Sequence, residues 1–196
     1  TFVNVGGLIG YEQFGLRNCF AIGPVSSADD YARIGGLVGD NAGSLTACYA
    51  TGSVTGFGSK ARVGELVGNT GMLGSIKSCY ATGPVRGNYY TGGLAGTGNS
   101  TYIAACFWDV QTSGTADGVG NLNPDPEGVI GLDTAEMMTL PPFIDAGWDF
   151  TNECANGTKE YWRMCVEGVD YPRLNWDIGE SDFACPNGVN IEDLDS

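Results

Sequence analysis

The chain repeats itself, and this constrains its fold more than any other feature. A block of the type x-Gly-Gly-Leu-x-Gly occurs four times, beginning at residues 5, 34, 63 and 91, so successive copies start 29, 29 and 28 residues apart. A unit of this length is too small to bury its own apolar side chains, so the copies must stack and share a core. The repeat therefore predicts a solenoid.

A second block follows the first one in every copy and indicates the type of solenoid. It is built around Cys-Tyr-Ala-Thr-Gly, and the fourth copy degenerates to Ala-Cys-Phe-Trp-Asp at residues 105–109. Both blocks are short, rich in β-branched and aromatic residues, and bounded by Gly, Asn and Ser, which favours strands. We predict an all-β fold, a parallel β-solenoid (β-helix) of about four 29-residue repeats over residues 1–109. One repeat would form one coil of two or three strands, although two coils per repeat also fit the pattern.

The two blocks together carry a family resemblance. Gly-Gly-Leu-Val-Gly at residues 35–39, followed by Cys-Tyr-Ala-Thr-Gly-Ser-Val at residues 48–54, resembles the GLUG repeat of large secreted bacterial surface proteins. These include adhesin-like proteins and non-catalytic regions of some IgA-specific metalloproteases. The resemblance implies surface display and repeat-mediated adhesion or assembly, with no common catalytic activity. Glu65 departs from the pattern, which makes the third copy a place where the turn differs or a local contact forms.

Residues 110–180 are predicted to form a loop and a small, irregular, β-rich C-terminal cap. Gly, Asn, Asp and Pro without apolar periodicity predict a long surface loop over residues 109–131. Asp133 precedes Glu136 by three positions, as at the start of a short helix, and Pro141-Pro142 would end that helix. Short strands are expected over residues 148–150, 161–166 and 172–176. The cap aromatics are expected to cover the end of the solenoid core.

The last residues, 181–196, resemble half of a degenerate dockerin-like Ca²⁺ loop. Asp182 and Asp193 occupy its first and twelfth positions, but Ala184 and Pro186 occupy positions that need side-chain oxygens. The resemblance therefore implies the start of an attachment module and only a weak possibility of Ca²⁺. No other cofactor and no metal site is predicted.

The seven cysteines favour an oxidising, extracellular setting. Four of them share one repeat position and are predicted to form a ladder in the core, either as inter-coil disulfides or, preferably, as reduced packing thiols: Cys19, Cys48, Cys79 and Cys106. Cys154 and Cys165 bracket a short turn of the cap and are the disulfide candidate. Asn99 and Asn156 begin N-glycosylation sequons.

The charge and the missing residue types exclude several classes of function. The chain has 23 acidic and 9 basic residues and a formal charge of -14, which predicts no nucleic-acid binding. No apolar run approaches the roughly 20 residues of a membrane span, so no membrane insertion is predicted. The chain has no histidine, the usual general base at neutral pH. We therefore predict that it is not an enzyme, and a polysaccharide-active β-helix enzyme is the least favoured alternative.

Two functional hypotheses follow. The first is a non-catalytic extracellular structural protein of the bacterial surface that self-associates head-to-tail into a fibre, because the chain begins almost directly in a repeat and leaves strand edges open. The second is an adhesin or glycan-binding region of a larger secreted protein. Its expected glycan contacts are aromatic residues of the repeats and the cap: Tyr49, Tyr80, Trp162 and Trp176.

Overall fold

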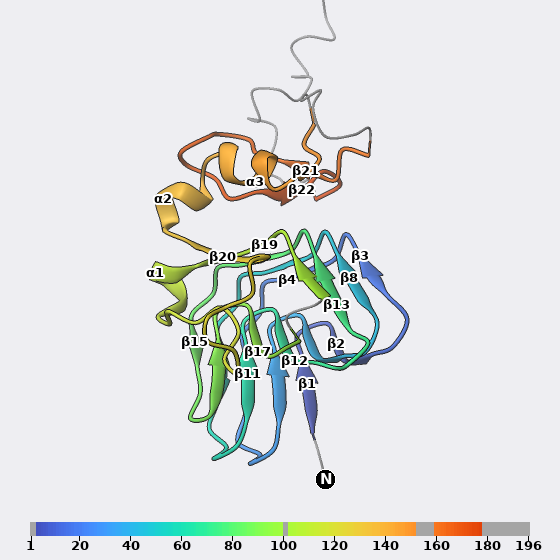
Figure 1. The fold of residues 1–196 in the computed structure, drawn as a ribbon, viewed down its shortest axis with the longest axis vertical. Coiled ribbons are helices and arrows are strands. Elements are labelled where there is room, and N and C mark those ends of the chain that lie inside the picture. The colour runs from blue at the N-terminus through green and yellow to red at the C-terminus, as the bar shows by residue number, and fades with distance from the viewer. Residues whose placement is uncertain (1–2, 100–101, 152–158, 178–196) are drawn as a thin grey trace, which may run out of the picture. The chain divides into compact units, whose positions relative to one another are not determined.

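The computed structural model describes residues 3–99, 102–151 and 159–177. These residues belong to two compact units, Thr1–Thr134 and Ala135–Ser196, here called unit 1 and unit 2. Unit 1 is a parallel β-solenoid of four coils, in which equivalent strands of successive coils lie side by side (Figure 1). The predicted fold class is thus confirmed.

Each of the first three coils contributes five short strands and the fourth contributes four, and equivalent strands pair in parallel and in register to form five sheets. Sheet A contains β1 (Asn4–Gly6), β6 (Arg33–Gly35), β11 (Arg62–Gly64) and β16 (Tyr90–Gly92). Sheet B contains β2 (Ile9–Glu12), β7 (Val38–Asn41), β12 (Val67–Thr70) and β17 (Ala95–Thr97). Sheet C contains β3 (Leu16–Arg17), β8 (Ser44–Thr46), β13 (Ser75–Lys77) and β18 (Ile103–Ala104).

The remaining two sheets complete each coil. Sheet D contains β4 (Phe20–Ala21), β9 (Tyr49–Ala50), β14 (Tyr80–Ala81), β19 (Cys106–Asp109) and a fifth strand, β20 (Val129–Leu132). Sheet E contains β5 (Val25–Ser27), β10 (Val54–Gly56) and β15 (Val85–Arg86). A complete coil therefore has five strands, the fourth coil lacks the strand of sheet E, and the prediction of two or three strands per coil was wrong. Strands of two to four residues are too short for alternation to separate one from the next.

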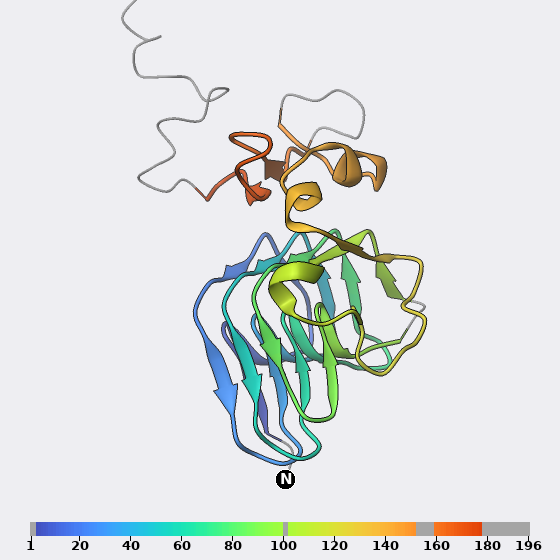
Figure 2. The same ribbon diagram turned by 90° about the vertical axis from the view of Figure 1, so that its left-hand side faces the viewer.

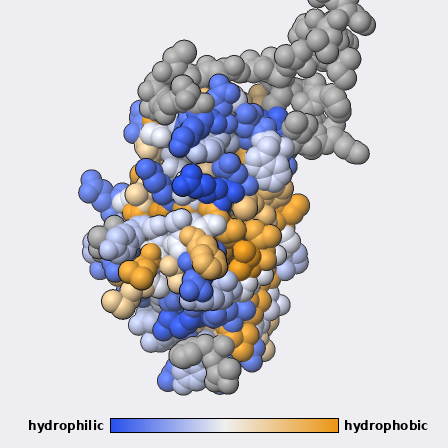
Figure 3. Space-filling model, turned by 90° about the vertical axis from the view of Figure 1, so that its right-hand side faces the viewer, coloured by the Kyte–Doolittle hydropathy of each residue, from blue (hydrophilic) through white to orange (hydrophobic). Residues whose placement is uncertain are grey.

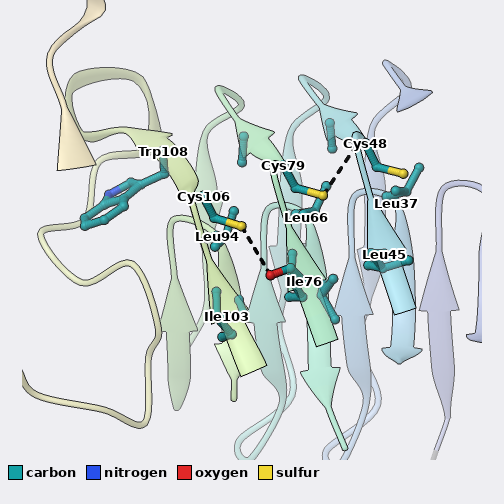
Figure 4. Close-up of a cluster of buried hydrophobic side chains, with 14 of the residues drawn as sticks. Leu37, Leu45, Cys48, Leu66, Ile76, Cys79, Leu94, Ile103, Cys106 and Trp108 are labelled. Atoms are coloured by element: carbon teal, nitrogen blue, oxygen red, sulfur yellow. Dashed lines mark hydrogen bonds between the residues drawn. The ribbon is translucent and has the colours of Figure 1, made fainter. Parts of the chain in front are cut away.

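The apolar side chains form two separate cores. The larger core contains the repeat leucines and the ladder cysteines of the second, third and fourth coils (Figure 4): Leu37, Leu66, Leu94, Cys48, Cys79 and Cys106. The smaller core lies between sheets A and E and includes Ile34, Val54, Val63 and Val85.

Glycine backbones separate the two cores. A Cβ atom on Gly35 of sheet A would lie 2.0 Å from the Val38 carbonyl oxygen, and one on Gly68 of sheet B would lie 2.3 Å from the Ile34 nitrogen. Sheets A and B therefore approach closely enough for their backbones to touch, and only glycine fits at these positions. This contact explains the two glycine positions that recur in each Gly-x-Leu-x-Gly block: the first glycine lies on sheet A and the second on sheet B.

Differences in repeat length are confined to the corners of the coils. Asn41 pairs with Thr70 and Ser44 pairs with Ser75. The corner between sheets B and C therefore has two residues (42–43) in the second coil and four (71–74) in the third. A second difference lies at the connection from one coil to the next. Six residues (56–61) connect Thr55 to Arg62, whereas only three residues (87–89) connect their pairing partners, Arg86 and Tyr90. The strands thus keep their register while the corners change in length.

Residues 110–132 do not form the predicted surface loop but a partial fifth coil (Figure 2). Helix α1 (Val110–Ser113) begins at Asp109, whose side chain accepts hydrogen bonds from the nitrogens of Gln111 and Thr112. Val119 then bridges to Ala95 of sheet B, and β20 pairs with β19. Val119, Val129 and Trp108 are all buried and close this end of the larger core. The prediction of a loop failed because this segment lacks the repeat period. Its few apolar residues, such as Val119 and Val129, nevertheless lie where they pack against the larger core.

Unit 2 is a small unit with an aromatic core of its own. It contains α2 (Thr134–Met137, which starts on the last residue of unit 1), α3 (Pro141–Asp145), and the antiparallel pair β21 (Trp162–Arg163) and β22 (Arg173–Leu174). Pro141 begins α3, where a proline needs no N–H partner, so it starts a second helix as well as following the first. Among the described residues, no helix is long and apolar enough to cross a membrane.

Candidate functional site

The first coil has an open edge on all five sheets. Within the described residues, strands β1 to β5 each pair on one side only. In the next coil, the N–H of Tyr49 donates to the Cys19 oxygen and the N–H of Thr51 donates to the Ala21 oxygen, and the same pattern recurs one coil later. The equivalent N–H groups of the first coil, those of Phe20 and Ile22, therefore point toward the open side.

Apolar surface gathers on this same end of unit 1 (Figure 3). Leu8 is 48% exposed, whereas the leucines at the same repeat position in the other three coils are 0% exposed. Phe14 and Ile22 are also strongly exposed. A row of unpaired strand edges next to apolar side chains is a template for a further strand layer.

The cysteine ladder forms at the predicted repeat position. Cys48, Cys79 and Cys106 are fully buried, Cys19 is half-buried, and all four are free thiols. Each thiol donates to the carbonyl two residues earlier, at 3.2–3.3 Å, on Arg17, Thr46, Lys77 and Ala104. Burial raises the pKa of the Cys79 thiol well above its ordinary value. Three of these thiols are thus small, fully buried core side chains, and Cys19 lies at the edge of the core.

The residue before each ladder cysteine has an unusual backbone conformation. Asn18, Ala47, Ser78 and Ala105 all have φ between 51° and 52°, in the left-handed region. This residue makes the sharp bend between sheets C and D. Because only one of the four is Asn and none is Gly, the sequence carried little signal for this bend.

The aromatic row of sheet D is not a glycan platform. The Tyr49 ring stacks on Phe20 on one side and on Tyr80 on the other, with ring centroids 5.0 Å apart in both pairs. Tyr49 and Tyr80 are 5% and 1% exposed. In-register parallel strands hold equivalent rings at about the strand spacing, so the ring faces contact each other and are not available to a sugar. The expected glycan contacts at Tyr49 and Tyr80 were therefore wrong.

The tryptophans of the cap differ from each other. Trp162 is 1% exposed and stacks on Trp148 at 4.4 Å, so it belongs to the aromatic core of unit 2 and its expected glycan contact was also wrong. Trp176 is 56% exposed, and its role as a glycan contact stays a prediction.

Several predicted positions lie outside the described residues. These are Cys154, Asn156 and the dockerin-like tail at residues 181–196. The pairing of Cys154 with Cys165 therefore stays a prediction. Asn99 is half-buried at the end of the described segment, and its glycosylation also stays a prediction.

A polar line that the sequence analysis missed crosses sheets A and B. In the second coil, Arg33 forms an ion pair with Asp40. In the third coil the equivalent residues are Arg62 and Asn69, and Arg62 Nη1 donates to Asn69 Oδ1 at 2.7 Å. Asn69 also donates to Asp40 Oδ1 and accepts from the Thr97 hydroxyl, both at 2.5 Å. The recurrence of Arg seven residues before Asp or Asn was the available signal.

Two neighbouring pockets, of about 340 and 290 Å³, open beside this line and share Arg62 and Tyr90. We call them together the tyrosine–arginine cleft. Its other residues come from strands of the solenoid, from the connections between coils and from the partial fifth coil: Tyr31, Lys60, Asn69, Thr70, Met72, Tyr89, Thr97, Gly98, Asn99 and Asn121. These residues are far apart in the sequence and meet only because the coils stack.

Glu65 occupies a glycine position of the repeat without changing the turn. The Gly36 nitrogen donates to the Glu65 carbonyl at 2.8 Å, and the strands on both sides keep their register. Its side chain is fully buried, and neither carboxylate oxygen has a hydrogen-bond partner. Burial raises the pKa of Glu65 well above its usual range. Glu65 is thus a buried acid that favours its neutral form.

The described residues contain no group of three or more Cys, Asp or Glu side chains that could hold a metal ion. The arrangements that stand out are instead an open strand edge and a cleft lined by tyrosines and cations.

The comparisons with known proteins agree with the repeat. A family described as the GLUG motif matches residues 30–55, which span the second coil from before β6 to β10. No curated protein and no solved structure matches the chain.

Proposed function

Starting from a GLUG motif repeated in space as four stacked coils, we propose that the chain is a non-catalytic extracellular structural protein that self-assembles head-to-tail. The observation that carries this proposal is the first coil, whose five strands pair on one side only within the described residues and whose Leu8, Phe14 and Ile22 are exposed.

A second copy of the chain is the occupant that fits this edge. A coil of the same repeat has five strands in the same arrangement, and coils of this chain already pair in register through every sheet. At the opposite end of unit 1, β15, β16 and β18 have no strand on their outer side within the described residues. Each end of unit 1 therefore offers strand edges, as head-to-tail contacts require.

The test uses two variants of Ile22, whose N–H points to the open side. Ile22→Pro removes that donor without removing a hydrogen bond inside unit 1, and Ile22→Thr keeps the donor and reduces the apolar surface. We expect light scattering and electron microscopy to show long oligomers for the wild type and for Ile22→Thr, and monomers for Ile22→Pro. A wild type that stays monomeric at high concentration would contradict self-assembly, and a closed dimer would contradict the head-to-tail arrangement.

The bacterial-surface adhesin hypothesis is the second candidate. Tyr49, Tyr80 and Trp162 do not support it, because their side chains are buried. The tyrosine–arginine cleft supports it instead, because it could bind a glycan.

A further inference from the structure

The tyrosine–arginine cleft has a local charge opposite to that of the chain. The protein carries 23 acidic and 9 basic residues, yet among the described residues the cleft is lined by Lys60 and Arg62 and by no Asp or Glu. The comparison with the second coil shows how this arises. There the equivalent arginine, Arg33, meets the carboxylate of Asp40, whereas Arg62 meets the neutral amide of Asn69. The amide orients the guanidinium without neutralising it.

The cleft also presents aromatic rings to solvent. Tyr31 and Tyr89 are each 50% exposed. Tyr89 packs against Tyr90 with ring centroids 4.0 Å apart and an angle of 48° between the rings. The Nζ atom of Lys60 lies 5.5 Å from the centre of the Tyr31 ring. Unlike the parallel rings of sheet D, the rings of Tyr89 and Tyr90 are tilted against each other, and half of the Tyr89 surface stays exposed to a ligand.

A buried polar atom without a partner lies in the same cleft. The Thr70 side chain is 6% exposed, and its hydroxyl has no hydrogen-bond partner within the described protein. A buried hydroxyl without a partner costs free energy that a ligand hydroxyl would offset. Thr97 and Asn121 add further polar groups to the lining.

From these three observations we propose that the cleft binds a glycan carrying an acidic sugar. The carboxylate of that sugar contacts Arg62 and Lys60, since a guanidinium recognises a carboxylate through paired hydrogen bonds. The C–H face of a pyranose ring lies against Tyr89 or Tyr31, because polarised C–H groups are attracted to the negative face of an aromatic ring. The sugar hydroxyls meet Thr70 and the amides.

The charge of the whole chain limits the ligand further. With a formal charge of -14, the protein repels a long polyanion at low salt. The cleft therefore suits an oligosaccharide with one acidic residue better than a polyuronate or a nucleic acid. This inference is independent of the open edge, because no cleft residue lies in strands β1 to β5.

The experiment titrates the full chain with glucuronic acid and with a disaccharide that ends in glucuronic acid, followed by amide chemical shifts. Glucose and the corresponding neutral disaccharide are the matched ligands. The variants are Arg62→Gln, Lys60→Gln and Tyr89→Ala. The controls lie outside the cleft: Arg86→Gln for the charge, and Tyr102→Ala, whose ring is 46% exposed, for the aromatic. Thermal unfolding of each variant verifies folding, and Lys60→Gln keeps the test decisive if Arg62→Gln is unstable.

We expect shifts at cleft residues, preference for the acidic over the neutral sugar, and a loss of affinity of about tenfold or more in Arg62→Gln, the amount expected for a hydrogen bond to a charged group. Tyr89→Ala should weaken both sugars, and the two controls should bind as the wild type does. Equal binding by the wild type, Lys60→Gln and Tyr89→Ala would overturn the proposal. So would shifts located elsewhere, or equally tight binding of inorganic phosphate or a glutamate-containing tripeptide.

Discussion

Replacing the buried acid of the third coil should stabilise the protein in a pH-dependent manner. Glu65 is fully buried with no hydrogen-bond partner, and burial raises its pKa in the folded state. The unfolded chain releases this proton near the ordinary glutamate pKa of about 4.3. Above that pH the folded protein must either keep the proton or bury a charge. The contribution of Glu65 to stability is therefore lost as the pH rises.

The size of the effect follows from linkage. Between the unfolded and the folded pKa, the free energy of unfolding of the wild type falls by about 1.4 kcal/mol per pH unit relative to a variant that cannot ionise at this position. Glu65→Gln keeps the shape of the side chain and removes the titration. We expect the difference in free energy of unfolding between Glu65→Gln and the wild type to be nearly constant below pH 4. Above pH 4 this difference should grow by about 1.4 kcal/mol per pH unit and level off at the pKa of Glu65 in the folded state.

The assay is urea unfolding of the wild type and Glu65→Gln at half-unit steps from pH 3.5 to 8. Glu127→Gln is the control, because it removes an exposed carboxylate of unit 1 and leaves the core intact. Comparing variants at each pH cancels the general repulsion among the acids of the chain. If the curves of the wild type and Glu65→Gln run parallel over the whole range, the carboxylate is solvated and the reasoning fails.

Three further predictions test the stacking of the coils. In urea unfolding, Leu66→Ala should lower the free energy of unfolding by about 2–5 kcal/mol because the side chain is fully buried, whereas Leu8→Ala at the same repeat position should lower it by well under half as much. Equal losses in the two variants would contradict the open edge. Gly52→Ala would place a Cβ atom 2.1 Å from the Gly23 oxygen and should unfold unit 1, whereas Gly23→Ala meets nothing within 4 Å and should shift circular-dichroism melting little. Ala47→Gly should stabilise by up to about 1 kcal/mol, because Ala47 has φ 51°, and a lower denaturation midpoint would refute this account of the bend.

The period of the repeat was sufficient to predict the solenoid, because stacking is what a 29-residue unit without its own core requires. It was also sufficient to place Cys48 and Ala50 on the core side of their strand. The five strands per coil and the division into two cores were not predictable in this way. Both depend on backbone contacts such as that between Gly35 and Gly68, which leave no trace in the pattern of apolar residues.

The functional residues were harder to predict than the fold. Tyr49 and Tyr80 were correctly recognised as a repeated pair, but their exposure depends on ring stacking between coils, which sequence alternation does not report. Arg62 and Tyr89 were overlooked because each is unremarkable by itself. Their significance depends on the replacement of Asp40 by Asn69 at one repeat position and on coils that bring distant residues together.

The corners that absorb changes in repeat length give the fold a way to diversify. The four-residue corner at residues 71–74 widens the perimeter of one coil while its strands stay in register with those of the neighbouring coils. Met72, which this corner carries, is 85% exposed and lies on the rim of the tyrosine–arginine cleft. Insertions at such a corner change the outline of a recognition surface and leave the pitch of the solenoid unaltered. A stack of such coils can therefore vary its contact surface coil by coil, as antibody loops vary on their constant framework.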